Sequence, residues 1–132
     1  MVTVIVIAML SSVAIPSYIR AIERGHWRAA RDVLETTYAG ETVYGTVNGS
    51  NYYSVSGGGD WRPIYMDDPN PPNGPFPSTL TFSVSGAANT FSATANQSGG
   101  GCGAWNLSLD QAHTWGGSTA PGGAPSEASV CP

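Results

Sequence analysis

The chain has 132 residues, a net charge of −4 and 11% charged residues, with five arginines and no lysine. This length suits one domain, and the negative balance gives no electrostatic indication of binding to nucleic acid, so no nucleic-acid partner is predicted. The charges are unevenly placed, because none occurs in residues 1–19 or in residues 69–109.

Residues 1–19, MVTVIVIAMLSSVAIPSYI, are apolar on every side when they are placed on a helix. Such a helix is about 28 Å long, close to the hydrocarbon thickness of a bilayer, so a membrane span is the first interpretation. A cleavable signal peptide fits worse, since no basic region precedes the run and no small-residue cleavage site follows it. A buried core helix is the other alternative, but a domain this small has little core to hide it.

Pro16 lies inside this predicted helix. A proline there removes the hydrogen bond to the carbonyl of Ser12 and clashes with that carbonyl. The hydroxyls of Ser11 and Ser12 are placed to satisfy freed carbonyls in lipid. We therefore expect a kink or a locally loosened helix over residues 11–16.

The helix is predicted to continue to about Tyr44, with residues 20–44 as its amphipathic half. Three charge pairs support it at i,i+3 or i,i+4 spacing: Arg20–Glu23, Arg28–Asp32 and Arg31–Glu35. Gly25 and Gly40 weaken it by about 1 kcal/mol each relative to alanine. The predicted apolar stripe comprises Ile15, Ile19, Ile22, His26, Ala29, Val33, Thr37 and Tyr44, with Ala30 and Leu34 beside it. A helix of about 65 Å is too long for its own domain to bury.

Residues 45–78 are rich in glycine and proline, which predicts a long loop with little regular structure. Its aromatic residues are expected to pin it onto the rest of the domain: Tyr52, Tyr53, Trp61, Tyr65 and Phe76. Carboxylate and amide oxygens of Asp67, Asp68 and Asn70 could bind Ca²⁺, with Asp60 and Asp110 as further ligands. No EF-hand spacing is present, so a solvated acidic turn is the favoured interpretation and no metal site is predicted.

Residues 79–132 predict a small head with an antiparallel sheet of three to four strands. Apolar and polar residues alternate over 80–84 and 91–95, which predicts a hairpin with its turn at 85–90. A third strand is predicted at 105–109, and a fourth begins at 113–115. A long helix followed by such a sheet gives the α+β class.

Cys102 and Cys131 are the two cysteines of the chain. An even count in a chain with an apolar start suggests one disulfide in an oxidising compartment, and two free buried thiols are the alternative. The disulfide would stabilise the fold by about 3–4 kcal/mol. His26 and His113 are too few and too far apart for a metal site, and no nucleophile has an organised base. We therefore predict no enzyme and no cofactor.

Residues 1–18, MVTVIVIAMLSSVAIPSY, resemble the N-terminal helix of the type IV pilin family, which includes the pseudopilins of type II secretion. The specific part is an Ala-Ile-Pro-x-Tyr segment at Ala14, Ile15, Pro16 and Tyr18. Elsewhere the likeness is architectural: a long helix, a variable αβ-loop, an antiparallel hairpin and a C-terminal cysteine pair. The resemblance implies the type IV pilin fold, with Cys102 to Cys131 as its disulfide-bounded C-terminal region.

The resemblance also implies a structural subunit that polymerises through its apolar helix into an extracellular type IV pilus. The expected filament-core residues are Met1, Val2, Val4, Ile5, Val6, Ile7, Met9, Leu10, Val13 and Ile15, with the kink at Ser12 and Pro16. Before assembly the chain would be anchored in the inner membrane, and a leader peptidase, a platform protein and an assembly ATPase would be its partners. The alternatives are a pseudopilin or minor pilin in secretion or DNA uptake, and a membrane-anchored binding domain that does not polymerise.

Members of this family begin with a basic leader, a processing site after glycine, an aromatic first mature residue and a glutamate shortly after it. Alignment on Pro16 places these features upstream of Met1, where we expect further residues. Four arginines follow the span, and the positive-inside rule alone would place the head in the cytoplasm. The family's leader supplies cytoplasmic positive charge instead, and the resulting outward orientation of the head agrees with the cysteines.

Overall fold

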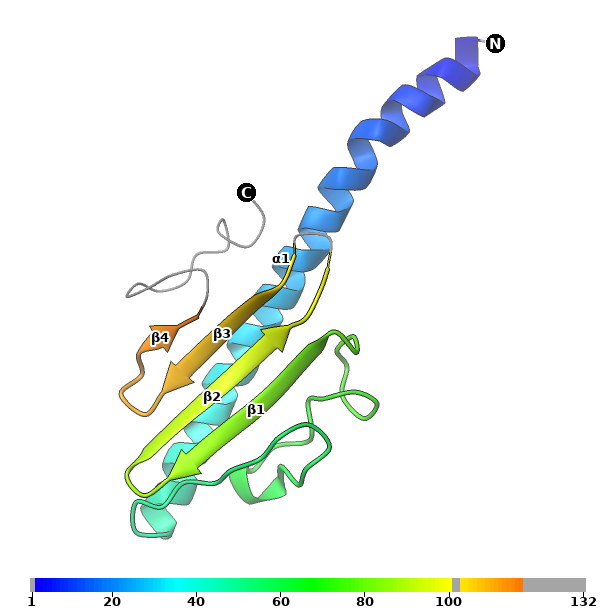
Figure 1. Ribbon diagram of the computed structural model, residues 1–132. Coiled ribbons are helices and arrows are strands. Elements are labelled where there is room, and N and C mark those ends of the chain that lie inside the picture. The colour runs from blue at the N-terminus through cyan, green and yellow to red at the C-terminus, as the bar shows by residue number, and fades with distance from the viewer. Residues whose placement is uncertain (1, 101–102, 118–132) are drawn as a thin grey trace.

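The computed structural model describes residues 2–100 and 103–117, with side chains from Ser17 onward. One long helix packs on a four-stranded antiparallel sheet, which confirms the α+β class (Figure 1). The elements in chain order are α1 (Val2–Val47), a short 3-10 helix η1 (Arg62–Ile64), β1 (Leu80–Ala87), β2 (Thr90–Gln97), β3 (Trp105–Asp110) and β4 (Trp115–Gly116).

The helix α1 is one unbroken element of 46 residues, so it is about 69 Å long. The helix continues through Pro16 and ends at Val47, three residues beyond the predicted Tyr44. Gly49, with a φ of 65°, and the N–H of Ser50, which donates to the carbonyl of Gly45 at 2.8 Å, close the end of the helix. The sheet covers only the C-terminal half of α1, and the N-terminal half extends away from it (Figure 1).

From residue 22 to residue 34, the buried stripe of α1 is shifted by one residue along the sequence from the predicted stripe, and the two share Thr37. The buried residues alternate in spacing between four and three: Glu23, Trp27, Ala30, Leu34, Thr37 and Glu41. Ile22, predicted to be inside, is 39% exposed, and His26 and Val33 are only half-buried. Because half of the buried positions are polar, a search for apolar periodicity selects the neighbouring stripe.

The sheet has the order β1-β2-β3-β4, with each strand antiparallel to the next. The predicted hairpin and third strand are confirmed, with a turn tighter than predicted at Ala88 and Asn89, the latter with a φ of 64°. The fourth strand begins at Trp115, because His113 lies in a turn with a φ of 59°. The carboxylate of Asp110 holds this turn by accepting the N–H groups of Ala112 and Thr114, each at 2.9 Å.

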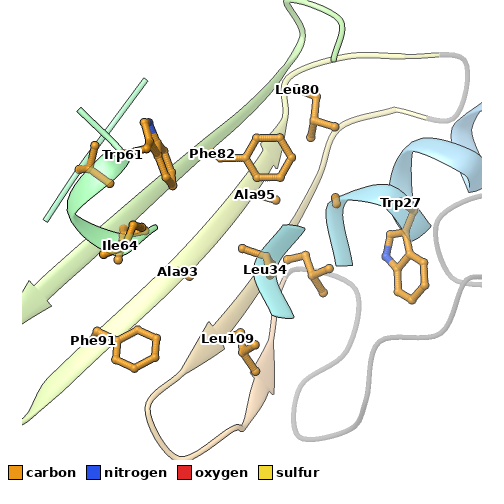
Figure 2. Packing of buried hydrophobic residues seen from close by; sticks show 14 of the residues in the cluster. Trp27, Leu34, Trp61, Ile64, Leu80, Phe82, Phe91, Ala93, Ala95 and Leu109 are labelled. Carbon is orange, nitrogen blue, oxygen red and sulfur yellow. The ribbon is translucent and has the colours of Figure 1, made fainter. Parts of the chain in front are cut away.

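The core lies between α1 and the inner face of the sheet (Figure 2). Alternate residues of the three long strands point into it: Leu80, Phe82, Val84, Phe91, Ala93, Ala95, Trp105, Leu107 and Leu109. On β2 two of the three are alanines, which leave room for Leu34 of α1 above the middle of the sheet. Small residues under the helix and large ones around it let the two layers interdigitate.

The loop between α1 and β1 covers the free edge of β1. All four N–H groups along that edge have acceptors in the loop: Leu80 with Pro77 O at 2.9 Å, Phe82 with Asn70 Oδ1 at 2.6 Å, Val84 with Val55 O at 2.6 Å and Gly86 with Ser54 Oγ at 2.8 Å. An uncovered edge would be a template for unwanted strand pairing. The loop therefore protects the sheet even though it is not itself a strand.

Most of the loop aromatics pin it as predicted. The rings of Tyr52 and Phe91 lie 4.9 Å apart, those of Tyr53 and Tyr44 5.6 Å and those of Phe76 and Phe82 5.1 Å, and Trp61 is only 2% exposed. Tyr65 is the exception, because it is 71% exposed and ends η1 with a φ of 61°. The left-handed backbone at Tyr65 turns its side chain away from the core.

Candidate functional site

Apart from Met1, which lies outside the described residues, the predicted filament-core residues lie on the part of α1 that extends away from the sheet (Figure 1). The helical backbone is described from Val2 onward, but the side chains of the predicted set lie outside the described ones: Met1, Val2, Val4, Ile5, Val6, Ile7, Met9, Leu10, Val13 and Ile15, together with Ser12 and Pro16 of the expected kink. The predicted disulfide also falls outside, because neither Cys102 nor Cys131 is among the described residues.

The first turns of α1 whose side chains are described, from Ser17 onward, carry apolar side chains that the head does not cover. Tyr18, Ile19 and Ile22 are 67%, 38% and 39% exposed. Within the side chains described from Ser17 onward, no helix combines the length and apolar character needed to cross a membrane. Exposed apolar side chains in a row on one element are typical of a surface that contacts another apolar surface.

A second exposed apolar area lies where η1 meets the C-terminal half of α1. An open groove of about 330 Å³ is lined there by Ala39, Gly40 and Val43 of α1 and by Ile64, Tyr65 and Met66 of the loop. Its rim is apolar, since Val43 is 49% and Tyr65 71% exposed. Sequence analysis missed this groove because it joins a helix to a loop with no regular pattern.

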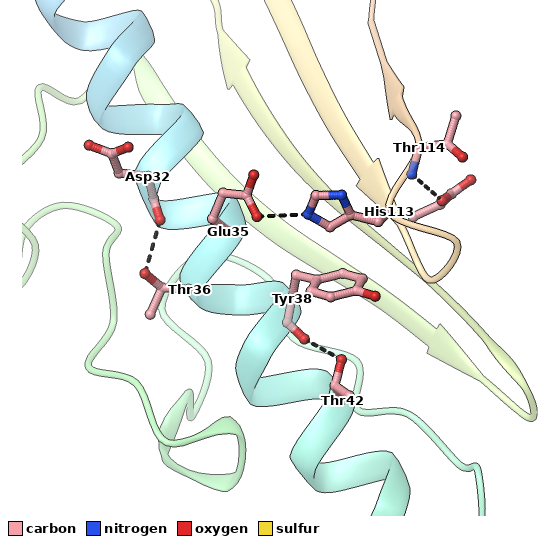
Figure 3. A network of polar contacts seen from close by, with 8 residues as sticks. Asp32, Glu35, Thr36, Tyr38, Thr42, His113 and Thr114 are labelled. Atoms are coloured by element: carbon pink, nitrogen blue, oxygen red, sulfur yellow. Dashed lines mark hydrogen bonds and ion pairs between the residues drawn. The ribbon is translucent and has the colours of Figure 1, made fainter. Parts of the chain in front are cut away.

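A cluster of polar and aromatic side chains fastens the β3–β4 turn to α1 (Figure 3). The Glu35 carboxylate lies 2.9 Å from Nε2 of His113, and the ring of Tyr38 meets that of His113 edge-on at 4.8 Å. Arg31 lies over the ring of Trp115, 5.4 Å from its centroid, although sequence analysis paired Arg31 with Glu35. Glu35 and His113 are 78 residues apart in the chain, so helical spacing could not reveal this pair. An ion pair this exposed contributes about 1 kcal/mol or less.

Three of the aspartates considered as Ca²⁺ ligands accept hydrogen bonds within their own turns. Asp60 accepts the N–H of Arg62 at 3.1 Å, Asp68 accepts that of Asn70 at 2.9 Å, and Asp110 holds the β3–β4 turn. Across residues 2–100 and 103–117, no group of three or more histidine, cysteine or acidic side chains could hold a metal ion. These carboxylates act as turn acceptors in the fold.

Glu41 is an acidic residue buried between α1 and the loop. It is 0% exposed, and its Oε2 accepts the N–H of Tyr53 at 2.9 Å. Its other oxygen, Oε1, is buried with no hydrogen-bond partner in the described part of the chain. Burial raises the pKa of Glu41, and the Tyr53 hydrogen bond offsets this only in part.

We expect the Glu41→Gln variant to be more stable than the parent chain at about pH 7, where ionised Glu41 destabilises the fold. Because the pKa of Glu41 is raised in the folded state, its contribution to the free energy of unfolding is most favourable below pH 4.5, the ordinary pKa of a glutamate. That contribution becomes less favourable as the pH rises from 4.5 to the pKa of the folded state. Denaturant unfolding of the full chain in detergent, followed by tryptophan fluorescence, gives the difference at several pH values. Asp67→Asn, at an exposed position, is the matched control. A Glu41→Gln effect independent of pH would contradict this expectation.

Apart from Val47 at the end of α1, the exposed large apolar side chains of the described residues thus form two groups, one at residues 18–22 of α1 and one at the groove between α1 and η1. Both suit contact with a further apolar surface rather than with a small polar ligand. Comparison of the chain with known proteins found no matching family model, no matching curated protein and no matching solved structure.

Proposed function

We propose that this chain is a structural subunit with the type IV pilin fold, which polymerises through its N-terminal helix into an extracellular filament. One observation carries the proposal. The helix α1 is continuous from Val2 to Val47, and among its side chains described from Ser17 onward the buried stripe begins at Glu23. The uncharged residues 2–19 therefore belong to a part of α1 that extends away from the sheet (Figure 1).

The physical chemistry of residues 2–19 supports a polymer. A helix that is apolar all round needs an apolar environment, and its own head offers none on that side. Lipid supplies one before assembly, and a bundle of identical helices supplies one afterwards. Tyr18, Ile19 and Ile22 extend the apolar surface to the edge of the head. The inner membrane, a leader peptidase, a platform protein and an assembly ATPase are the partners that the family resemblance adds.

Electron microscopy of filaments sheared from the native cells, with mass spectrometry of the same fraction, tests the proposal. We expect thin filaments in which this chain is the dominant protein, and the mature mass shows whether residues precede Met1. A chain that stays wholly in the membrane fraction, in cells that form no filament, would contradict the polymer. That result would favour a pseudopilin of a short pseudopilus or an anchored domain that does not polymerise.

A further inference from the structure

The large apolar side chains that α1 exposes gather on one side of the helix. Each residue of an α-helix advances about 100° around the axis, so Tyr18, Ile22, Val43 and Val47 fall within an arc of about 60°. Each of these four side chains is at least 39% exposed. Among the side chains of α1 described from Ser17 onward, Ile19 is the one exposed large apolar residue outside the arc. The head thus leaves one apolar side of α1 uncovered.

We call this side of α1 the uncharged arc. Besides the four apolar residues it contains Gly25, Ala29, Thr36 and Gly40. The charged residues of α1 from Ser17 onward all lie outside it: Arg20, Glu23, Arg24, Arg28, Arg31, Asp32, Glu35 and Glu41. The hydroxyl of Thr36 donates to the carbonyl of Asp32 at 2.9 Å, so it needs no further acceptor. An exposed helix face normally carries charged residues, and a face without charge over about 44 Å is typical of a packing surface.

The uncharged arc has exposed side chains at one end and a hollow at the other. Tyr18 and Ile22 lie exposed before the head begins. Gly40 and Val43 line the groove of about 330 Å³, and Tyr65 lines its other side. The two ends are about 33 Å apart along one unbroken helix, because 22 residues separate Tyr18 from Gly40. A single copy therefore cannot bring its exposed apolar side chains to its own groove.

We propose that the groove between α1 and η1 holds Tyr18 and Ile22 of a second copy, an inference that rests on the proposed filament. With the two helices parallel, Tyr18 of the second copy lies beside Gly40 of the first. The same shift of 22 residues lays residues 3–18 of the second copy along residues 25–40 of the first. The charge-free segment of one copy then covers the uncharged arc of the other.

Continuity and charge point to a second copy as the occupant. The uncharged arc follows directly on the charge-free residues 1–19, on the same helix. An apolar surface gains nothing from a charged partner, and the chain itself supplies an uncharged helix of the length required. Gly25 allows a close approach of the two helices, because a Cβ there would have no atom within 4 Å. The contact joins two different surfaces, so it repeats from copy to copy without closing.

Paired cysteines test the contact in sheared filaments. Ile22→Cys together with Val43→Cys puts one thiol at each end of the contact on every copy. We expect mild oxidation to give disulfide-linked ladders of dimers, trimers and longer chains, which mass spectrometry maps to a bond between positions 22 and 43. Each single variant should give no ladder, because each copy then carries half of the pair. Tyr18→Cys with Val43→Cys is a second pair. Ile22→Cys with Thr81→Cys, an exposed change on the outer sheet face, is the control that should not link.

A charge in the groove provides the second test. Val43→Glu should lower filament yield about tenfold or more, because its carboxylate would be buried against an apolar neighbour. Thr42→Glu puts the same charge on the adjacent exposed residue, outside the uncharged arc, and should leave the yield unchanged. Val43→Leu keeps the groove apolar and should also preserve the filament. Denaturant unfolding in detergent should give the two glutamate variants the same free energy of unfolding, so that a difference in yield reports the contact.

Filaments in which neither cysteine pair links would overturn the contact, whatever their yield, and would leave the polymer intact. A thiol at position 43 that links to a different protein would overturn the second copy as the occupant. If the parent chain forms no filament, the proposed function fails and this contact fails with it.

Discussion

Replacing Leu10 with arginine is expected to abolish the filament. Leu10 is at the middle of the charge-free residues 1–19. Arginine at the centre of a membrane helix is unfavourable by about 3 kcal/mol, and an unpaired charge inside a helix bundle is unfavourable by several more. In the proposed filament this penalty recurs at every subunit, so even a modest value per copy prevents growth. The yield of sheared filaments, measured against the amount of chain in the cells, gives the result.

Two matched variants separate this effect from a general loss of protein. Leu10→Met keeps the position apolar and of similar volume, so it should preserve the filament. Thr46→Arg places the same charge on an exposed position of α1 within the head and should also preserve it. Filaments of normal yield from Leu10→Arg would show that residues 1–19 are not packed in an apolar core. Equal loss from Thr46→Arg would point to charge in general rather than to this segment.

The strands could be predicted from the sequence because each one carries its own pattern. The inward residues of β1, β2 and β3 alternate with polar residues, and the helix above them covers only one face. The pattern is local, so no knowledge of distant residues is needed. The pattern does not mark the strand ends, since β1 and β2 continue to Ala87 and Gln97 through residues with little apolar character.

The orientation of α1 could not be predicted, because two neighbouring stripes compete. Ile19 and Ile22 suggest one stripe, while the sheet buries the other, through Trp27 and Leu34. The buried stripe includes Glu23, Thr37 and Glu41, which a hydrophobicity count scores against it. Glu41 accepts the N–H of Tyr53, and this hydrogen bond forms only when the loop folds back onto α1.

The long loop was expected to be structurally irregular, and only the three-dimensional fold shows what holds it. Asn70 is 1% exposed and accepts the N–H of Phe82, while its own N–H groups donate to Asp68. A single asparagine thus joins the loop to the edge of β1. No periodicity marks such a residue, because its role depends on one partner 12 positions along the chain. The contacts of His113 with α1 were hidden in the same way.

Gly40→Ala is expected to destabilise the fold although it improves the helix propensity of α1. A Cβ at this position would overlap the carbonyl oxygen of Ile64, which is backbone and cannot turn aside. The segment around η1 must then move away from α1, which loosens Ile64 and Trp61 in the core. Overpacking of this kind lowers the free energy of unfolding by about 1–3 kcal/mol, more than the gain of about 1 kcal/mol from alanine in a helix.

Gly25→Ala is the matched control on the same helix. A Cβ at Gly25 would have no atom within 4 Å, so the substitution brings only the propensity gain. We expect it to raise the free energy of unfolding by about 0.5–1 kcal/mol. Denaturant unfolding of both variants and the parent chain in the same detergent measures the two changes. Changes of opposite sign in the free energy of unfolding would place the contact between α1 and η1 at Gly40. A rise in the free energy of unfolding of both variants would show that η1 does not press on the helix there.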